Sequence, residues 1–464
     1  MEKFDVVVIG AGPGGYPAAI RAAQLGASVA IVEKECPGGT CLNWGCIPTK
    51  LLIAGSDLYE SVVHASSLGV KAQGVAYDYA AMVARKAQVV KKLNDGVGML
   101  LKSNGVKVLP GVGSFVGKHQ IAVRGKDSET RVEAGRTIIA TGSVSAMPKF
   151  LPRHPRVVES RSFLELTSLP KSVIVLGGGV IGCEFACMLG QLGIKTTIVE
   201  MLEDVLAPLD ADVRRELRRR MEGELGIRIL TGKPLEKIEA NDKGVSGMVG
   251  EERVEAELLL ASIGRWAVTE GLGLDALGLE KGKAGEIAVN DYCQTKVPTI
   301  YAIGDVTGGL QLAHRATSMG ITAAEHAVGK SRGKAETIIP SCIFTSPEIG
   351  AVGLTEQEAK ARNLAVKVGK FPFSALGKAM ATGHTAGFVK WIADAKTDQL
   401  LGAHAIGAHA TDLIAEAALA IRSEQTAAEV GATVHSHPTL SEAWMEAAHM
   451  VHGACTHLPA KRAK

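Results

Sequence analysis

Two segments of this chain repeat one pattern: an apolar strand, three spaced glycines, a helix-like run and a second strand that ends in an acidic residue. They cover residues 5–33 and 173–200. Each predicts a β-strand, α-helix, β-strand unit, because such glycines permit a tight turn, the close approach of a pyrophosphate and packing of the helix on the strand. The N-terminus of the helix binds phosphate through its free N–H groups. Two copies therefore predict two bound dinucleotides.

The acidic residues that close the two units predict how each dinucleotide is held. Glu33 and Glu200 stand where a carboxylate accepts hydrogen bonds from a ribose diol. Glu200 favours NAD, since a 2′-phosphate would meet a like charge there. The glycines of the two patterns are Gly10, Gly12, Gly15, Gly177, Gly179 and Gly182.

Length, charge and apolar patterning limit the class of protein. The 464 residues exceed what one core accommodates, so we expect three or four domains. The net charge of +3 argues against nucleic acid as a partner, and the absence of long apolar runs argues against a membrane span. The chain enters a strand directly at its N-terminus, which predicts a cytoplasmic protein. In that reducing compartment a disulfide is more often catalytic than structural.

Three cysteines lie close together around the run GGTCLNWGCIPTK, residues 38–50. Cys46 precedes a predicted helix, whose dipole would stabilise a thiolate. Cys41 lies five residues earlier, and in an ideal helix this spacing is about 7.5 Å, too long for a disulfide. A Cys41–Cys46 pair therefore needs an irregular turn, which Asn43 and Gly45 would allow. We favour this pair, but the spacing equally permits Cys36–Cys41, and three reduced thiols remain a further alternative.

Two further segments carry polar residues suited to redox chemistry. Residues 433–444 contain His435, His437 and Glu442, and a histidine oriented by a carboxylate takes a proton from a thiol near neutral pH. Two histidines on one strand face would also suit a metal, but no further ligands are nearby, so we predict no metal site. Residues 301–306 predict a strand ending in Asp305, whose carboxylate would suit the ribityl hydroxyls of a flavin.

On these motifs the chain resembles the pyridine nucleotide–disulfide oxidoreductases over essentially its whole length. The resemblance implies that Cys41 and Cys46 form the redox disulfide, and it selects His437, with Glu442, as the acid–base pair. It implies that FAD is bound tightly and that NAD exchanges. The residues implied to contact the cofactors, beyond the glycines and acids above, are Gly14, Lys34, Gly39, Thr40, Lys50, Gly113, Thr141, Gly142, Ser143, Val180, Ile181, Glu184, Gly264, Gly304, Asp305, Gln311, Leu312, Ala313 and His314.

The resemblance also implies an α/β fold of four regions. These are an FAD-binding domain at 1–147, an NAD-binding domain at 148–272, a central domain at 273–340 that completes the FAD site, and an α+β dimerisation domain at 341–464. The first two are Rossmann-like. Residues 383–407 alternate like two antiparallel strands, and residues 410–426 read as an amphipathic helix. The implied assembly is a homodimer whose active site is shared between subunits.

The function implied is oxidation of protein-bound dihydrolipoyl groups, with hydride passed to NAD⁺. The partner would be a lipoyl-carrying acyltransferase or carrier protein. Alternatives are a glutathione-reductase-like enzyme using NAD(P)H and a flavin-binding subunit without turnover. Two features depart from the family pattern: Trp44 is bulkier than the usual aliphatic residue, and the segment GRWAVT from Gly264 lacks the usual Pro-Asn pair.

Overall fold

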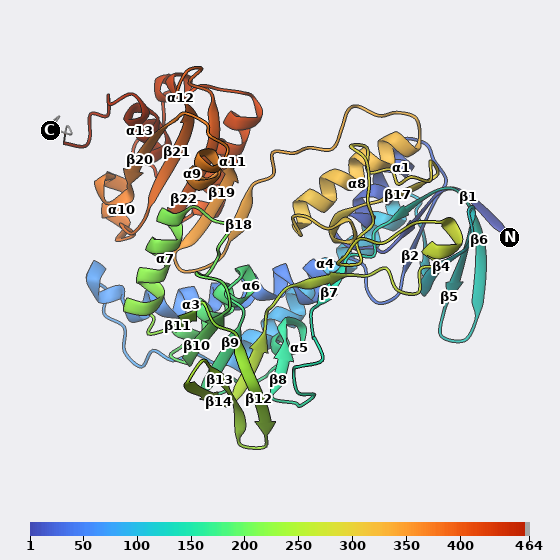
Figure 1. The fold of residues 1–464 in the computed structure, drawn as a ribbon, viewed down its shortest axis with the longest axis horizontal. Helices are drawn as coiled ribbons and strands as arrows, with labels where there is room; N and C mark the ends of the chain where they lie inside the picture. The colour runs from blue at the N-terminus through green and yellow to red at the C-terminus, as the bar shows by residue number, and fades with distance from the viewer. Residues whose placement is uncertain (460–464) are drawn as a thin grey trace.

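The computed structural model describes residues 1–459 and has a mixed α/β fold, which confirms the predicted class (Figure 1). Three large sheets, each with its own helices, follow one another along the chain. In Figure 1 the N-terminal sheet and the C-terminal sheet lie at opposite sides of the molecule, and the middle sheet lies below them.

The N-terminal sheet contains the first predicted βαβ unit. Its order is β3-β2-β1-β6-β5-β4, with β17 beside β6, so that the strand from the later part of the chain completes the sheet. The strands are β1 (Glu2–Ile9), β2 (Val29–Glu33), β3 (Lys107–Pro110), β4 (Val112–Gly117), β5 (Gln120–Arg124), β6 (Glu129–Ile139) and β17 (Ile300–Ala302).

The strands of this sheet point alternate side chains into two apolar layers, one on each face of the sheet. Helices cover one of these faces. Val6 and Val8 pack with α1 (Gly15–Gln24) and α8 (Ala313–Ala327), whereas Val7 and Ile9 face the opposite layer. The helix predicted for the first βαβ unit is therefore present, as α1.

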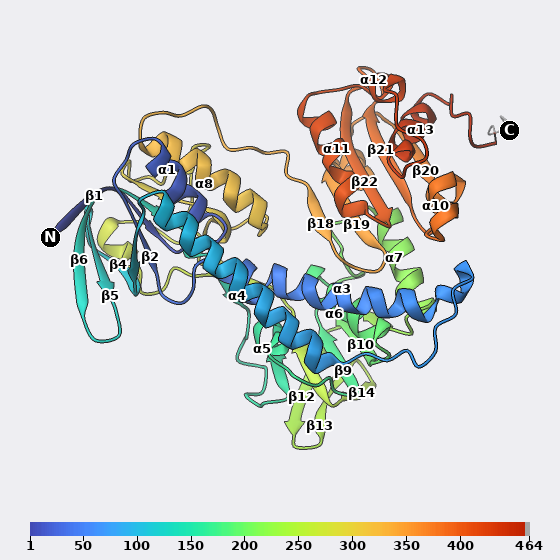
Figure 2. The same ribbon diagram turned by 180° about the vertical axis from the view of Figure 1, so that it is seen from behind.

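Two long helices extend from this sheet toward the middle of the molecule, as Figure 2 shows. They are α3 (Cys46–Val63) and α4 (Tyr79–Ser103), joined through the 3₁₀ turn η1 (Ala65–Leu68). The short helix α2 (Gly39–Trp44) precedes them. Because α3 packs on a helix of the second sheet, it brings the cysteine segment to the junction of the two.

The second sheet is entirely parallel and contains the second βαβ unit. Its order is β11-β10-β9-β15-β8. An antiparallel three-stranded sheet, β12-β13-β14, is appended to it. The elements are β8 (Val157–Glu159), α5 (Ser160–Leu164), β9 (Ser172–Leu176), α6 (Val180–Gln191), β10 (Lys195–Glu200), α7 (Ala211–Gly223), β11 (Arg228–Thr231), β12 (Leu235–Asn241), β13 (Gly244–Val249), β14 (Glu252–Ala256) and β15 (Leu258–Ala261).

Two short strands connect the first and second sheets. β7 (Ser143–Ser145) pairs with β16 (Arg265–Ala267), so the GRWAVT segment that departs from the family pattern begins as a strand. After it come the 3₁₀ turns η2 (Leu274–Leu277) and η3 (Gly304–Thr307). The boundaries proposed above for the four regions stay a prediction.

The third sheet is antiparallel, in the order β18-β19-β22-β21-β20. The predicted strand pair and the amphipathic helix after it are both confirmed, as β21, β22 and α11. The elements are β18 (Ser341–Ile343), β19 (Glu348–Gly353), α9 (Glu356–Ala361), β20 (Val366–Pro372), η4 (Phe373–Ala375), α10 (Gly377–Thr382), β21 (Phe388–Asp394), β22 (Leu400–Gly407), α11 (Ala410–Arg422), α12 (Ala427–Ala432) and α13 (Glu442–Val451).

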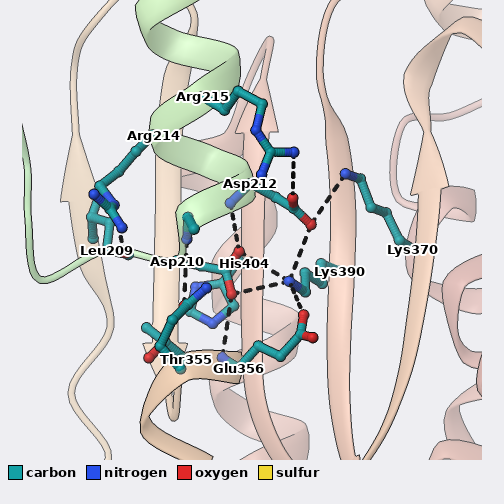
Figure 3. Close-up of polar contacts among 12 residues, drawn as sticks. Leu209, Asp210, Asp212, Arg214, Arg215, Thr355, Glu356, Lys370, Lys390 and His404 are labelled. Atoms are coloured by element: carbon teal, nitrogen blue, oxygen red, sulfur yellow. Dashed lines mark hydrogen bonds and ion pairs between the residues drawn. The ribbon is translucent and has the colours of Figure 1, made fainter. Parts of the chain in front are cut away.

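A buried cluster of charges joins the second and third sheets (Figure 3). Lys370, Lys390 and His404 are cross-strand neighbours on β20, β21 and β22. Asp210, the N-cap residue of α7, meets this row, and both its carboxylate oxygens lie 3.0 Å from Lys390 Nζ. Glu356 lies 2.6 Å from the same nitrogen. Lys390 and Asp210 are almost completely buried, so this contact fixes α7 against the C-terminal sheet.

Candidate active site

The glycine turn of the first βαβ unit, residues 10–15, is the first of two cradles for a dinucleotide. Close backbone contacts shape it. Gly10 has φ +104°, and a Cβ there would lie 2.3 Å from the carbonyl oxygen of Ala140. A Cβ at Gly15 would lie 1.9 Å from the carbonyl oxygen of Gly10. At the end of β2, Glu33 accepts hydrogen bonds from the N–H groups of Ala11 and Glu35, each at 2.8 Å. These bonds hold the carboxylate beside the glycine turn, and its contact with a ribose stays a prediction.

The second cradle repeats this arrangement. A Cβ at Gly177 would lie 2.5 Å from the carbonyl oxygen of Ser262, and one at Gly182 would lie 2.0 Å from that of Gly177. Glu200 accepts hydrogen bonds from the N–H groups of Gly178, at 2.6 Å, and Leu202, at 2.8 Å. The first and second cradles therefore have the same backbone arrangement.

One cavity of about 1730 Å³ connects the two cradles. Its lining contains Cys41, Cys46 and nearly every residue predicted to contact a cofactor. Gly15 and Gly182 are outside the lining because they pack a helix against a strand. Within residues 1–459 the lining also lacks His437 and Glu442. The residues that it brings together are Gly10, Gly12, Gly14, Glu33, Lys34, Gly39, Thr40, Lys50, Gly113, Thr141, Gly142, Ser143, Gly177, Gly179, Val180, Ile181, Glu184, Glu200, Gly264, Gly304, Asp305, Gln311, Leu312, Ala313 and His314.

Cys41 and Cys46 lie on two successive helices that break at Gly45. Gly45 has φ −140° and ψ −111°, so Cys46 begins α3 in a new direction. Asn43 does not form part of the irregular turn, because it is helical and its amide donates to the carbonyl groups of Pro37 and Gly39. All eight cysteines, which lie within the described range, are free thiols in this structure.

The two thiols are hydrogen-bonded to each other with opposite effects on their pKa values. The hydrogen bond from Cys41, together with the nearby ammonium of Lys50, lowers the pKa of Cys46 to about 7. The same hydrogen bond and burial raise the pKa of Cys41. Cys46 is therefore the sulfur that the surroundings hold as a thiolate, in agreement with its place at the start of a helix.

Lys50 and Glu184 link the helix that begins at Cys46 to the helix of the second cradle. Lys50, one helical turn after Cys46, donates to both carboxylate oxygens of Glu184 on α6, at 2.7 and 2.8 Å. Glu184 is 4% exposed and also accepts from the N–H of Phe344. This pair links α3, α6 and the segment after β18 directly beneath the thiols.

Asp305 lines the cavity, but the strand predicted to end at this residue ends earlier. β17 ends at Ala302, and Gly304, with φ +69°, turns the chain into η3, which carries Asp305. Asp305 accepts a hydrogen bond from the Ser143 hydroxyl at 2.5 Å. Arg265, which the sequence analysis missed as a site residue, donates to that hydroxyl at 2.7 Å. Its only sequence signal is its place directly after Gly264.

His437 and Glu442 form a close pair in the C-terminal region. His437 Nδ1 lies 2.8 Å from Glu442 Oε1, and the other carboxylate oxygen accepts from the N–H of Thr439. These contacts lower the pKa of Glu442 although burial opposes them. The histidine side chain is 75% exposed. The prediction that His435 and His437 share a strand face is wrong, because the described chain has no strand between α12 and α13.

Comparisons with known proteins agree with this geometry. The profile of the family described as "Pyridine nucleotide-disulphide oxidoreductase" matches residues 4–320, and that of its dimerisation domain matches residues 339–448. The chain belongs to this oxidoreductase family. The structure is similar to that of LpdA from Mycobacterium tuberculosis, with a TM-score of 0.91 and 28% identity, covering 97% of this chain and 99% of the other.

Several similar oxidoreductases of this family are named dihydrolipoyl dehydrogenase. The protein from Bacillus subtilis is 44% identical, over 98% of this chain and 99% of its own length. The protein from Chlamydia pneumoniae is 43% identical, over 99% of each chain. A flavoprotein disulfide reductase, RclA from Escherichia coli, has a TM-score of 0.89 at 26% identity and covers 97% of this chain and all of its own.

Oxidoreductases of this family use FAD and NAD, and the two cradles fit these groups. The middle glycines supply the test. A Cβ at Gly179 would meet no described atom within 4 Å, and one at Gly12 would meet only the Cα of Gly39, at 3.9 Å. The protein itself does not require glycine at either position, whereas close approach of a pyrophosphate does.

Trp44 is held by a residue that sequence reasoning missed. The guanidinium of Arg161, on α5, lies 3.9 Å from the centre of the Trp44 ring, and Arg161 also pairs with Glu35 at 3.0 Å. No local sequence pattern signals this contact, because α5 and α2 are brought together only by the fold. The bulky residue between the cysteines is thereby fixed on the wall of the cavity.

Two negative findings apply to residues 1–459. No helix there is both long enough and apolar enough to cross a membrane. No group of three or more histidine, cysteine, aspartate or glutamate side chains in that range is arranged to hold a metal ion.

The Cys46 thiolate gives a pH-dependent prediction. In a Cys41→Ser variant the serine hydroxyl can still donate, and we expect Cys46 to ionise near pH 7, against about 8.5 for a free thiol. The thiolate is present above the midpoint and lost below it. Adding Lys50→Met should raise the midpoint, because a stabilising cation is removed and Glu184 is left unpaired.

The measurement is a pH titration of the long-wavelength absorption band that a thiolate produces beside a bound flavin. Lys107→Met is the control, since Lys107 is on β3 and pairs with Glu2 away from the thiols. A midpoint unmoved by Lys50→Met would contradict the assigned electrostatic cause.

Proposed function

We propose that this protein is a dihydrolipoyl dehydrogenase, which oxidises protein-bound dihydrolipoyl groups and passes the electrons to NAD⁺. The observation that carries the proposal is the Cys41–Cys46 thiol pair on the wall of the cavity that joins the two cradles, with Cys46 held as the thiolate. The names of the similar proteins from Bacillus subtilis and Chlamydia pneumoniae support the choice of substrate.

In the proposed reaction the enzyme begins with a Cys41–Cys46 disulfide. His437, oriented by Glu442, takes the proton of one substrate thiol on its Nε2, because its Nδ1 is engaged by the carboxylate. The substrate thiolate attacks the Cys41 sulfur, the disulfide breaks, and Cys46 leaves as a thiolate.

The second substrate thiol completes the exchange. Once deprotonated, it attacks the substrate sulfur bonded to Cys41, and Cys41 leaves and takes up a proton. The substrate dithiol has become a disulfide, and two electrons now reside on the two enzyme thiols. The first cradle, with Glu33, would hold FAD, which would supply the acceptor for this electron pair, and the second cradle, with Glu200, would hold the NAD⁺ that takes up hydride. Lys50 stabilises the Cys46 thiolate once the disulfide has broken.

The position of His437 supports a shared active site in a homodimer. His437 is exposed, does not line the described cavity, and belongs to the region that matches the dimerisation domain. A second copy would supply the histidine to the thiols of the first. The lipoyl group would arrive on an acyltransferase or carrier protein.

The test is a steady-state assay of the purified protein with dihydrolipoamide, run with NAD⁺ and with NADP⁺. We expect turnover with NAD⁺ and at least about tenfold less with NADP⁺, because Glu200 opposes a 2′-phosphate. Glutathione disulfide with NADPH is the counter-assay. Turnover only in the counter-assay would exclude the proposed substrate, and no turnover in either would favour the non-catalytic alternative.

A further inference from the structure

A second histidine–carboxylate pair lies beside the proposed base. His435 Nε2 lies 2.7 Å from Glu416 Oε1 on α11, and His435 Nδ1 lies 2.9 Å from the carbonyl oxygen of Thr433. The ring of His435 is thereby held from both sides, by the backbone of its own loop and by a carboxylate of α11.

The two histidines of the loop are in opposite situations. The side chain of His435 is 6% exposed, whereas that of His437 is 75% exposed. Both nitrogens of His435 are engaged, so it has no free nitrogen with which to exchange a proton. His437 has one nitrogen on Glu442, which leaves Nε2 for chemistry. The loop thus contains one histidine suited to act as a base and one suited to act as an anchor.

The first half of the loop at residues 433–441 has few other anchors, whereas at its far end Leu440 packs on the C-terminal core. Val434 is 94% exposed, so apolar packing does not hold this part of the loop. Thr433 and Thr439 bond only to the flanking helices or to the loop itself. His435 is different because it ties the loop to α11, an element that lies earlier in the chain.

We propose that the His435–Glu416 contact positions His437, by fixing the loop so that Nε2 of His437 stands at a set place for the incoming dithiol. This inference rests on the proposed function, in which His437 is the base. An error of about 1 Å in such a group costs up to about 100-fold in rate. Loss of the pair should therefore slow proton transfer from the dithiol and leave the distant nucleotide chemistry unchanged.

The experiment compares His435→Gln, Glu416→Gln and the double variant as FAD-loaded dimers. Stopped-flow absorbance measures flavin reduction by dihydrolipoamide, by dithiothreitol and, separately, by NADH. We expect each single variant to lose about 10- to 100-fold with both dithiols and to keep the NADH rate within about twofold. The double variant should lose no more than the more damaged single variant, because both changes remove one interaction.

His452→Gln is the matched control. It removes another histidine–carboxylate contact of the same region, His452 to Asp398 at 3.2 Å, and should leave all three rates unchanged. His437→Gln shows the full loss expected without the base. Parallel losses of the dithiol rate, the NADH rate and the melting temperature would overturn the inference, because they indicate general damage. Losses that multiply in the double variant would also overturn it.

The two dithiols separate this inference from the proposed function. If the unaltered enzyme does not react with dihydrolipoamide, but its reaction with dithiothreitol is slowed in both single variants, the substrate assignment fails and the positioning role stands. If dihydrolipoamide reacts and both variants are as fast as the unaltered enzyme, the positioning role fails and the function stands.

Discussion

A Cys46→Ser variant is expected to lose dihydrolipoamide turnover on the order of 10⁴-fold or more, while FAD remains bound. Serine is close to cysteine in size but cannot form the disulfide that accepts the substrate thiolate. Cys41 would then lack the sulfur with which it interacts in the structure. The first cradle, with its glycines and Glu33, is not changed by the substitution.

Cys36→Ser is the matched control, because Cys36 lies on the same segment, before α2, and was the other partner permitted by spacing. It should retain turnover. The measurements are steady-state rates with dihydrolipoamide and NAD⁺, and the visible flavin spectrum of each purified variant. If Cys36→Ser is inactive and Cys46→Ser is active, the redox pair is Cys36–Cys41 and the proposed pairing is wrong.

Removing Lys390 is expected to produce the largest loss of stability. Lys390→Ala leaves Asp210, which is fully buried, without its cation, and breaking a buried ion pair in this way costs about 3–5 kcal/mol. Burial alone would raise the pKa of Asp210, but His404, Lys390 and the N–H of Asp212 together lower it. Without Lys390 the carboxylate must take up a proton or lose its burial, and either outcome weakens the contact between α7 and the C-terminal sheet that Figure 3 shows.

Lys370→Ala tests the same strand row with an exposed residue. Its side chain is 41% exposed and lies 3.3 Å from Asp212, so its loss should cost about 1 kcal/mol or less. The measurement is denaturant unfolding of the FAD-loaded protein for each variant. Changing both buried partners, as Lys390→Met with Asp210→Leu, should recover most of the loss. Equal effects of Lys390→Ala and Lys370→Ala would contradict the assigned role of burial.

The sequence predicted well whatever depends on neighbours in the chain. The glycines and acids of the two cradles, the helix after Cys46 and the strand pair ahead of α11 all follow from local pattern. The predictions were wrong where a single glycine redirects the backbone, and where two alternate histidines were taken to lie on a strand. Gly304 ends the expected strand before Asp305, and the segment around His435 is a loop. Helix α2 was not predicted because it is short and begins at the second of two glycines.

The tertiary structure alone decided which distant side chains meet. Lys50 with Glu184, Arg265 with Ser143, Arg161 with Trp44 and Lys390 with Asp210 are all contacts between separate elements. The sequence by itself determined two nucleotide cradles and a thiol pair, because turns and helix ends are set by residues next to one another. It did not determine these pairs or the exposure of His437, because burial and charge pairing depend on how whole sheets pack.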